Sequence, residues 1–450
     1  MEPNRIEQEN IANDSVSKEK NGSTDHHHHH RHSSSESRHS SRRRRESFLK
    51  RLDHKLNRRF GRKANLVRNL IAFGLALVIL VAVTAIAVVI ENQRRNAIEG
   101  QHNGAYTDDS IQILVGYHSE EIVLISEAAM EYLESDNSLS IMDMPGVSGS
   151  LGDGKDKPKS VKLALSITGG ASEYSNSDLI LMLSRNDPNF TDPTIHSVNA
   201  RDGYVELKNL YTNSKYYYKI TVDGTDFTVS SSFTTADTPR FIDVEGAVNL
   251  RDFGNWQTAS GKRINQGLLY RGSEIDGKIV PTMKITEDGI STMLNDLGIK
   301  TDMDLRHSET AGEHPTPLGG DVSHVYYGMP MYTYMFDKNG GEVVKTIFAE
   351  LADKSNYPIY IHCTYGKDRT GEICYLLGAL LGMSDEDLLR DFELSALAHG
   401  EVDLEGYAFM VNYIKSEYDG ASTCQKVENY LLSIGVTSEQ IASIRSIFLD

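Results

Sequence analysis

The sequence predicts an α/β domain whose central sheet is flanked by helices, preceded by an all-β sandwich and a single transmembrane helix. Three observations predict these parts. Residues 70–90 form a 21-residue run without a charge, residues 160–237 alternate apolar and polar side chains, and residues 358–383 change from strand to helix periodicity. We expect five segments in chain order: a disordered basic head at 1–66, the transmembrane helix at 67–92, a stalk or linker at 93–157, the sandwich at 158–237 and the α/β domain at 238–450.

The apolar run from Leu70 to Ile90 is long enough to cross a lipid bilayer. At about 1.5 Å per residue, a helix of this length spans roughly 30 Å, the thickness of the hydrocarbon core. Arg and Lys are dense on its N-terminal flank, from Arg42 to Arg68, and only Arg94 and Arg95 lie close on the other side. The positive-inside rule therefore predicts a single-pass protein of the cell membrane with a cytoplasmic N-terminus and an extracytoplasmic C-terminal domain.

The head and the rest of the chain carry opposite charge. Residues 1–66 hold 16 Lys and Arg against 9 Asp and Glu, whereas the remainder holds 30 against 54. The head has a His run at 26–30, a Ser/Arg-rich stretch and no apolar periodicity, so we expect residues 1–45 to be disordered. The acidic remainder excludes nucleic acid as a partner, because phosphate contacts need clustered Lys and Arg. No cluster of ligand residues suggests a metal in the C-terminal domain, and we expect no cofactor.

Strand-like segments follow one another between residues 160 and 237, separated by turn residues. The stretch LKNLYTNSKYYYKITVDGTDFTVSSSFTT resembles the end of a fibronectin type III domain, in which a Leu precedes a short turn and a Tyr begins the next strand. Leu210 would be that Leu, and Tyr217 or Tyr218 would form the tyrosine corner. The resemblance implies a spacer or a weak binding module.

The loop from Cys363 to Arg369 joins a predicted buried strand to a predicted helix at Arg369–Met383. Such a junction directs several backbone N–H groups, and the positive end of a helix dipole, at one anion of phosphate size. The planar fork of Arg369 suits two phosphate oxygens, and the same field stabilises a thiolate at Cys363. These parts together predict attack of the thiolate on a phosphate monoester through a phosphocysteine intermediate.

The run HCTYGKDRTG strongly resembles the HCxxGKDRTG phosphate loop, a CX5R motif, of bacterial secreted-type tyrosine and dual-specificity (lipid) phosphatases. Three outlying elements are also similar to that family: Asn249–Gly254, Leu268–Ser273, and Asp304–Arg306 with Glu309. The resemblance covers roughly residues 240–450. It implies a protein-tyrosine-phosphatase-like phosphoric monoester hydrolase that acts on phosphotyrosine, with phosphoserine, phosphothreonine and phosphoinositides as further substrates of the family.

The resemblance also assigns roles to the loop residues. Cys363 would be the nucleophile and Arg369 the phosphate clamp, His362 would orient the loop, and Thr370 would donate its hydroxyl to the departing thiolate. The remaining residues that we expect to contact the phosphate are Thr364, Tyr365, Gly366, Lys367 and Gly371. Those that we expect to brace the loop through charge pairs are Arg251, Asp252, Asp304 and Arg306.

The general acid has two candidates. The resemblance favours Asp368, which lies inside the loop, whereas Asp337 lies in the segment MFDKNGG before the catalytic strand and could do the same work. The function also has an alternative: a catalytically inert surface-adhesion or scaffold protein that binds a partner through its sandwich. Turnover of a phosphate monoester separates the two.

Overall fold

The computed structural model describes residues 102–108, 111–116, 121–135, 139–147, 154–168, 177–306, 315–329 and 331–450. All of them belong to one compact unit, Arg95–Asp450. The head and the predicted transmembrane helix lie outside the described residues, and so does Glu309. Within the described ranges, no helix has both the length and the apolar character needed to cross a membrane.

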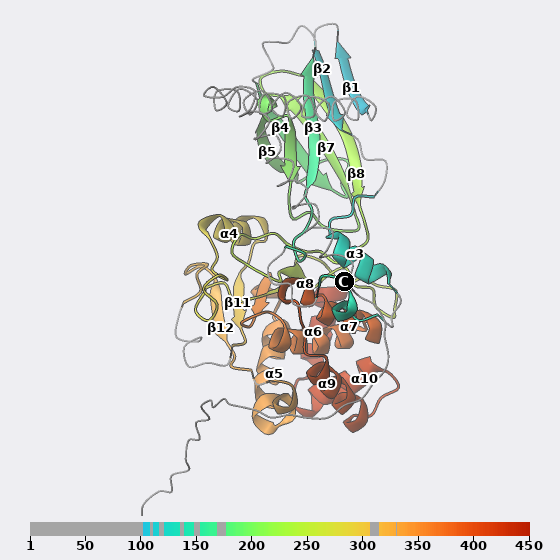
Figure 1. Cartoon of the computed structure of the whole chain (residues 1–450), viewed down its shortest axis with the longest axis vertical. Helices are drawn as coiled ribbons and strands as arrows, with labels where there is room; N and C mark the ends of the chain where they lie inside the picture. The colour runs from blue at the N-terminus through green and yellow to red at the C-terminus, as the bar shows by residue number, and fades with distance from the viewer. Residues whose placement is uncertain are drawn as a thin grey trace, which may run out of the picture. The chain divides into compact units, whose positions relative to one another are not determined.

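The N-terminal part of this unit is a sandwich of two four-stranded sheets (Figure 1). One sheet has the order β1-β2-β3-β6, with strands His102–Asp108, Ile111–Gly116, Val161–Thr168 and Tyr204–Leu207. The other has the order β5-β4-β7-β8, with strands Thr194–Asn199, Asp178–Arg185, Ser214–Val222 and Thr228–Thr235. Neighbouring strands are antiparallel throughout. An all-β sandwich is therefore present, and its fibronectin type III identity stays a prediction.

The sandwich begins earlier than predicted. Strands β1 and β2 come from residues that we expected in the stalk, and β2 pairs with β3 so that Leu114 lies opposite Ser166. The segment IQILVG is a short apolar run, which periodicity alone does not assign to a strand. Its partner lies some fifty residues further along the chain, so the pairing leaves no local signal.

The tyrosine corner also differs from the prediction. Alternation along β7 turns Tyr216 and Tyr218 inward and leaves Tyr217 half-buried. The hydroxyl that closes the corner belongs to Tyr216, which accepts a hydrogen bond of 2.8 Å from the backbone N–H of Tyr211. The corner residue is therefore Tyr216, and Leu210 lies in the core as expected.

Between the hairpin β1–β2 and strand β3, the chain packs on the α/β domain rather than forming a linker. We call the described residues between 121 and 157 the strap. It holds helix α3 (Glu127–Glu134) and a 3-10 turn η2 (Ile141–Asp143). Its buried residues share one hydrophobic core with the α/β domain: Ile125, Ala129, Tyr132, Ile141, Met144 and Val147. The strap is therefore a structural part of that domain.

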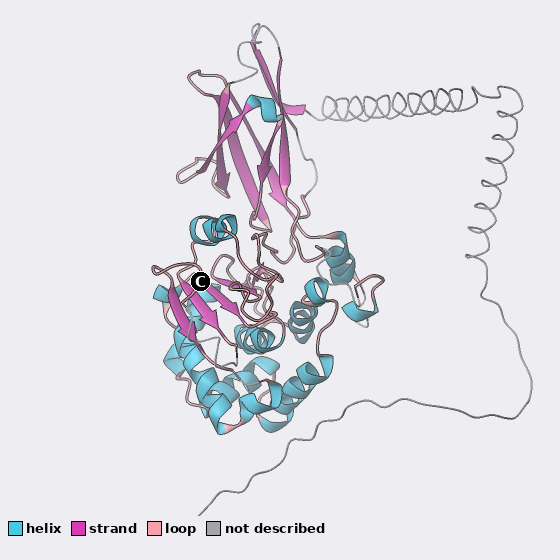
Figure 2. Ribbon diagram, turned by 60° about the vertical axis from the view of Figure 1, so that its left-hand side comes forward, coloured by secondary structure: helices cyan, strands magenta, loops and turns pink. Residues whose placement is uncertain are grey.

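The α/β domain has a five-stranded sheet in the order β12-β11-β13-β10-β9. Its strands are β9 (Arg251–Asp252), β10 (Leu269–Gly272), β11 (Thr301–Asp304), β12 (Ser323–Tyr326) and β13 (Ile359–His362). All are parallel except β9. Helices flank the sheet (Figure 2): α4 (Glu287–Ser291), α5 (Lys338–Leu351), α6 (Asp368–Leu381), α7 (Asp385–Glu393), α8 (Ala396–His399), α9 (Leu404–Glu417), α10 (Thr423–Ser433) and α11 (Ser438–Leu449). The predicted α/β architecture is confirmed.

Helix α6 lies at the centre of the domain, with nearly every residue after its first turn buried. Its apolar character on all sides is that of a core helix. Gly382, in the left-handed conformation, ends it within two residues of the predicted boundary. Two capping interactions follow it: the Ser384 hydroxyl accepts from the Asp387 N–H, and Thr437 forms a complete capping box with Gln440.

Candidate active site

The loop Cys363–Arg369 connects the central strand β13 to the N-terminus of α6. Cys363 is 3% exposed, at the carboxyl end of the parallel strand, where open α/β sheets bind their ligands. No backbone N–H from Thr364 to Arg369 donates a hydrogen bond to a described residue, and the first to do so is that of Gly371, to the Lys367 carbonyl at 2.9 Å. The loop therefore has the form of an anion nest.

The loop's shape depends on a glycine and on carbonyl contacts from behind. Gly366 has φ 65°, and a Cβ there would lie 2.2 Å from the Gly272 carbonyl oxygen. The Gly366 carbonyl accepts from the Arg271 guanidinium at 3.0 Å and from Asn249 Nδ2 at 3.1 Å. These two side chains bind the Gly366 carbonyl oxygen, whereas the backbone N–H groups of the loop remain available to a ligand. The part played by Arg271 was not predicted.

Arg369 and Thr370 have polar atoms without partners. Arg369 is half-buried, and within the described ranges its Nε has no hydrogen-bond partner. The Thr370 hydroxyl is fully buried and equally without one. A buried polar atom is normally paired, so two such atoms on one loop indicate a position for a polar ligand. Both residues lie where the sequence predicts the phosphate clamp and the thiolate donor.

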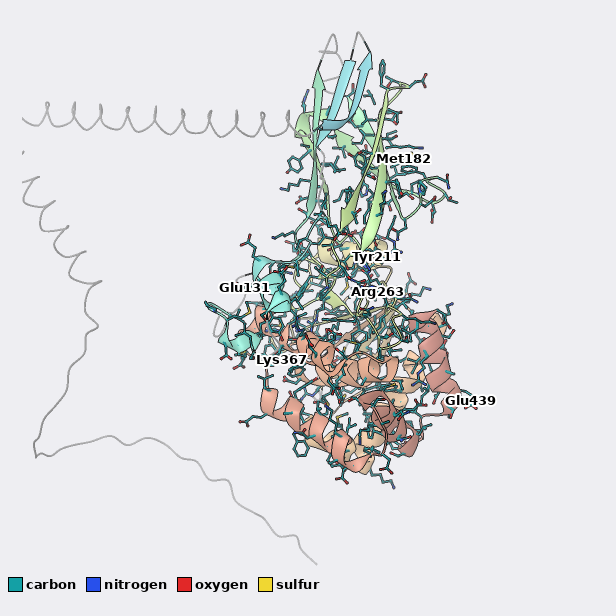
Figure 3. All side chains as sticks on the ribbon, turned by 90° about the vertical axis from the view of Figure 1, so that its right-hand side faces the viewer. Glu131, Met182, Tyr211, Arg263, Lys367 and Glu439 are labelled. Carbon is teal, nitrogen blue, oxygen red and sulfur yellow. The ribbon has the colours of Figure 1, made fainter. Side chains whose placement is uncertain are left out.

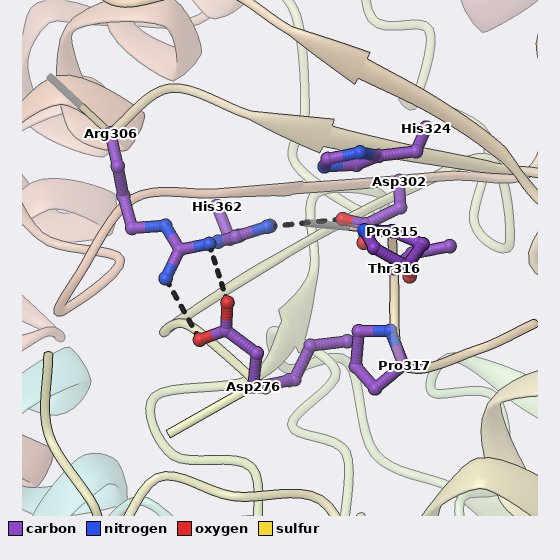
Figure 4. Close-up of a pocket in the computed structure, with 9 residues that line it drawn as sticks. Asp276, Asp302, Arg306, Pro315, Thr316, Pro317, His324 and His362 are labelled. Carbon is purple, nitrogen blue, oxygen red and sulfur yellow. Dashed lines mark hydrogen bonds and ion pairs between the residues drawn. The ribbon is translucent and has the colours of Figure 1, made fainter. Parts of the chain in front are cut away.

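His362 pairs with a residue that the sequence analysis missed. Its Nε2 lies 3.0 Å from Asp302 Oδ1 (Figure 4). Burial opposes the charged form, but Asp304 and Asp302 outweigh it and raise the pKa of His362 to about 9. His362 is therefore a cation at neutral pH, adjacent in the chain to Cys363. The alternation in the strand TDMD, which places Asp302 and Asp304 on one face, was the available signal.

The predicted pair of Asp304 and Arg306 is present and belongs to a larger cluster. Arg306 Nη2 lies 2.7 Å from Asp304 Oδ2, and the same guanidinium contacts Glu274 and Asp276, each at 2.8 Å. Figure 4 shows the contact with Asp276. The Glu274 N–H in turn donates to the Thr364 carbonyl at 2.9 Å. This cluster braces the start of the loop, and its two extra carboxylates were not predicted.

The prediction that Arg251 and Asp252 both brace the loop requires a correction, because the two side chains contact different parts of the protein. Arg251 Nε lies 3.1 Å from Asp391 Oδ1, and Asp391 also pairs with Arg271 behind the loop. Asp252 instead pairs with Arg240 at 2.9 Å, and Arg240 contacts backbone carbonyls of the sandwich. Successive residues of a strand point to opposite faces, so only Arg251 braces the loop.

The two general-acid candidates have different surroundings. Asp368 is the first residue of α6, and its Oδ1 accepts from the Tyr332 hydroxyl at 2.7 Å. Asp337 is exposed and caps α5, accepting from the Gly340 N–H at 2.7 Å. An N-cap carboxylate already has a structural role. The geometry therefore supports Asp368.

Three of the predicted phosphate contacts remain to be described: Lys367, Tyr365 and Gly371. Lys367, labelled in Figure 3, is largely buried and lies 3.6 Å from the exposed carboxylate of Glu401. Tyr365 is 43% exposed, with its carbonyl 2.7 Å from His399 Nε2. A Cβ on Gly371 would lie 2.7 Å from the Phe392 ring, so this glycine permits helix packing, and its contact with phosphate stays a prediction.

Comparison with known proteins finds a likeness to one protein family. Residues 242–450 match the model of the tyrosine phosphatase family. A tyrosine-protein phosphatase of Nostoc commune is 25% identical over 199 residues, which cover 33% of this chain and 66% of that relative, just under two thirds of its length. The crystal structure of the core catalytic domain of PP-IP phosphatase SIW14 from S. cerevisiae in complex with citrate is 21% identical, covering 33% of this chain and 82% of that chain with a TM-score of 0.25. The likeness to the tyrosine phosphatase family thus covers the α/β domain, residues 242–450.

Proposed function

We propose that the protein hydrolyses phosphate monoesters through a phosphocysteine intermediate at Cys363. One observation carries the proposal: on the loop that begins at Cys363, the N–H groups from Thr364 to Arg369 and Arg369 Nε have no partners among the described residues. Such donors stabilise the equatorial oxygens of a phosphoryl group as it transfers, because they are already in place when charge develops.

The proposed reaction has two steps. The Cys363 thiolate attacks phosphorus while the bond to the leaving oxygen breaks, and Asp368 gives that oxygen its proton. Water then attacks the phosphocysteine, Asp368 takes the proton from the water, and the P–S bond breaks. The Thr370 hydroxyl donates to the thiolate that is released. Atoms and charge balance without a metal or cofactor.

The proposed substrates are phosphotyrosine proteins, with phosphoserine, phosphothreonine and phosphoinositides as further candidates. Lys367 supports a substrate with more than one phosphate, since it places a second cation on the loop beside Arg369. Its neighbour Glu401 is 75% exposed and so is free to move away when an anion arrives. The proposal includes the site of action, the outer membrane face, on the basis of the apolar run at residues 70–90.

Mutation of the nucleophile and of the clamp tests the proposal. With the full chain in detergent, Cys363→Ser should lose turnover of a phosphotyrosine peptide and of a bis-phosphorylated inositol lipid, yet still bind orthovanadate, because the nest and Arg369 remain. Arg369→Ala should lose both properties. Hydrolysis by the Cys363→Ser protein would overturn the covalent mechanism. Vanadate binding without turnover by the wild-type protein would favour the inert scaffold.

A further inference from the structure

Tyr332, a residue outside the phosphate loop, contacts two carboxyl groups of α6. Its hydroxyl donates to Asp368 Oδ1 at 2.7 Å, and its backbone N–H donates to Glu372 Oε1 at 2.8 Å. Asp368 and Glu372 are one helical turn apart, so they lie on the same face of α6. Tyr332 therefore connects the proposed general acid to a second, fully buried carboxyl.

Tyr332 is held tightly in this position. It begins the 3-10 turn η5 (Tyr332–Phe336), which packs against α6 and α9, and the residue is 7% exposed. Its φ of 45° is left-handed, a conformation that non-glycine residues seldom adopt without a local cause. The ring lies on Gly406 of α9, where a Cβ would approach Tyr332 Cε2 to 2.4 Å. Both the backbone and the ring are thus fixed by neighbours.

The surroundings of Tyr332 and Glu372 favour protonated side chains, which suits a fixed hydrogen-bond direction. Burial, and then the charge of Asp368, raise the pKa of Tyr332, so the phenol keeps its proton and stays a donor. Burial raises the pKa of Glu372 far above the usual carboxyl range, with Asp368 and Cys363 acting in the same direction. Burial therefore favours the neutral form of Glu372, and in that form it accepts the Tyr332 N–H without adding a negative charge near Cys363.

We infer that Tyr332 is a positioning residue for the general acid, and that Glu372 holds Tyr332 in place. The inference rests on the proposed function. Because the phenol occupies Oδ1, the transferable proton of Asp368 lies on Oδ2. When that proton passes to the leaving oxygen, Asp368 becomes a carboxylate and the hydrogen bond from Tyr332 becomes charge-assisted. The contact is stronger after proton transfer than before, and it therefore favours the transition state.

The leaving group provides the test. A good leaving group, such as 2,4-dinitrophenolate, departs without a proton, whereas phenolate needs one. In the full chain, Tyr332→Phe should lower kcat/KM for phenyl phosphate by about tenfold or more and that for 2,4-dinitrophenyl phosphate by less than about threefold. Tyr327→Phe is the matched control, because its hydroxyl donates at 2.8 Å to a carboxylate outside the loop, that of Glu350. It should change neither value.

Substitutions of Glu372 provide a second test of the inference. A substitution of Asp368 provides the reference for the leaving-group dependence. Glu372→Ala should reproduce the leaving-group dependence of Tyr332→Phe. Glu372→Gln keeps an acceptor of the same shape and should restore most of the lost rate. Asp368→Asn should show the same dependence more strongly. If Asp368→Asn shows it and Tyr332→Phe does not, the inference is wrong and the acid assignment stands. If the wild-type chain turns over neither ester while binding vanadate, the proposed function has failed instead.

Discussion

At the scale of single residues, the pairing of His362 with Asp302 makes stability depend on pH. The imidazolium is fully buried, and its pKa of about 9 lies above the ordinary value of about 6.5. A raised folded-state pKa gives stability that is complete below about pH 6.5 and is lost as the pH rises through about 9. We therefore expect the free energy of unfolding of the α/β domain to fall by as much as about 3 kcal/mol between these two pH values.

Urea unfolding at pH 6.5, 7.5 and 9, followed by a probe in the α/β domain, measures this dependence. His362→Gln should flatten it, since the glutamine does not titrate. His196→Gln is the control: burial lowers the pKa of His196, so its stability contribution changes only below about pH 6.5. A pH dependence that survives in His362→Gln would show that another group is responsible.

At the scale of elements, the strap reaches the phosphate loop through one buried contact. Asp156 Oδ2 accepts from the Asn249 N–H at 2.8 Å, and Asn249 Nδ2 donates at 3.1 Å to the carbonyls of Tyr365 and Gly366. Asp156 is 3% exposed and lies outside the stretch that matches the phosphatase family. A chain starting at residue 238 would therefore lack one of the loop's supports and six buried core residues.

Asp156→Ala tests this connection. The loss of a buried, charge-assisted acceptor should cost about 1–3 kcal/mol of stability and should weaken orthovanadate binding as well, because Asn249 is freed to shift. Asp156→Asn keeps an acceptor and should retain most of the stability and most of the orthovanadate affinity. Asp143→Ala, an exposed change in the same strap, is the control and should alter neither. Reduced stability with unchanged vanadate affinity would mean that the strap supports the fold alone.

Elements fixed by local sequence were predictable, and those fixed by distant partners were not. Helix α6, its C-terminal glycine and the capping boxes rest on residues within a few positions of one another. Strands β1 and β2 and the strap depend on partners far along the chain, so their own sequence indicated only a stalk. The same holds within the site: Cys363 and Arg369 form a short motif, whereas Asp391 lies far from the two arginines with which it pairs.

At the scale of the whole molecule, the sandwich and the α/β domain meet at a buried cation. Arg240 is 2% exposed, pairs with Asp252 at 2.9 Å and donates to the carbonyls of Asn209 and Leu210 at the end of the sandwich. Gln266 adds hydrogen bonds to Thr212. Removing one partner of a buried ion pair is costly, so the two parts are fastened together rather than joined by a free linker. The described unit therefore behaves as one body.

The last prediction is that the chain crosses a membrane in one orientation. The basic stretch at residues 42–68 and the apolar run at 70–90 predict a cytoplasmic head and an extracytoplasmic unit, because positive flanks stay on the cytoplasmic side. Protease added to intact cells that express the protein should therefore digest the phosphatase domain and leave an antibody epitope placed before residue 42 protected. Permeabilised cells are the control, in which both should be cleaved. Digestion of the epitope in intact cells, with vanadate-sensitive phosphatase activity spared, would reverse the orientation and place the substrates in the cytoplasm.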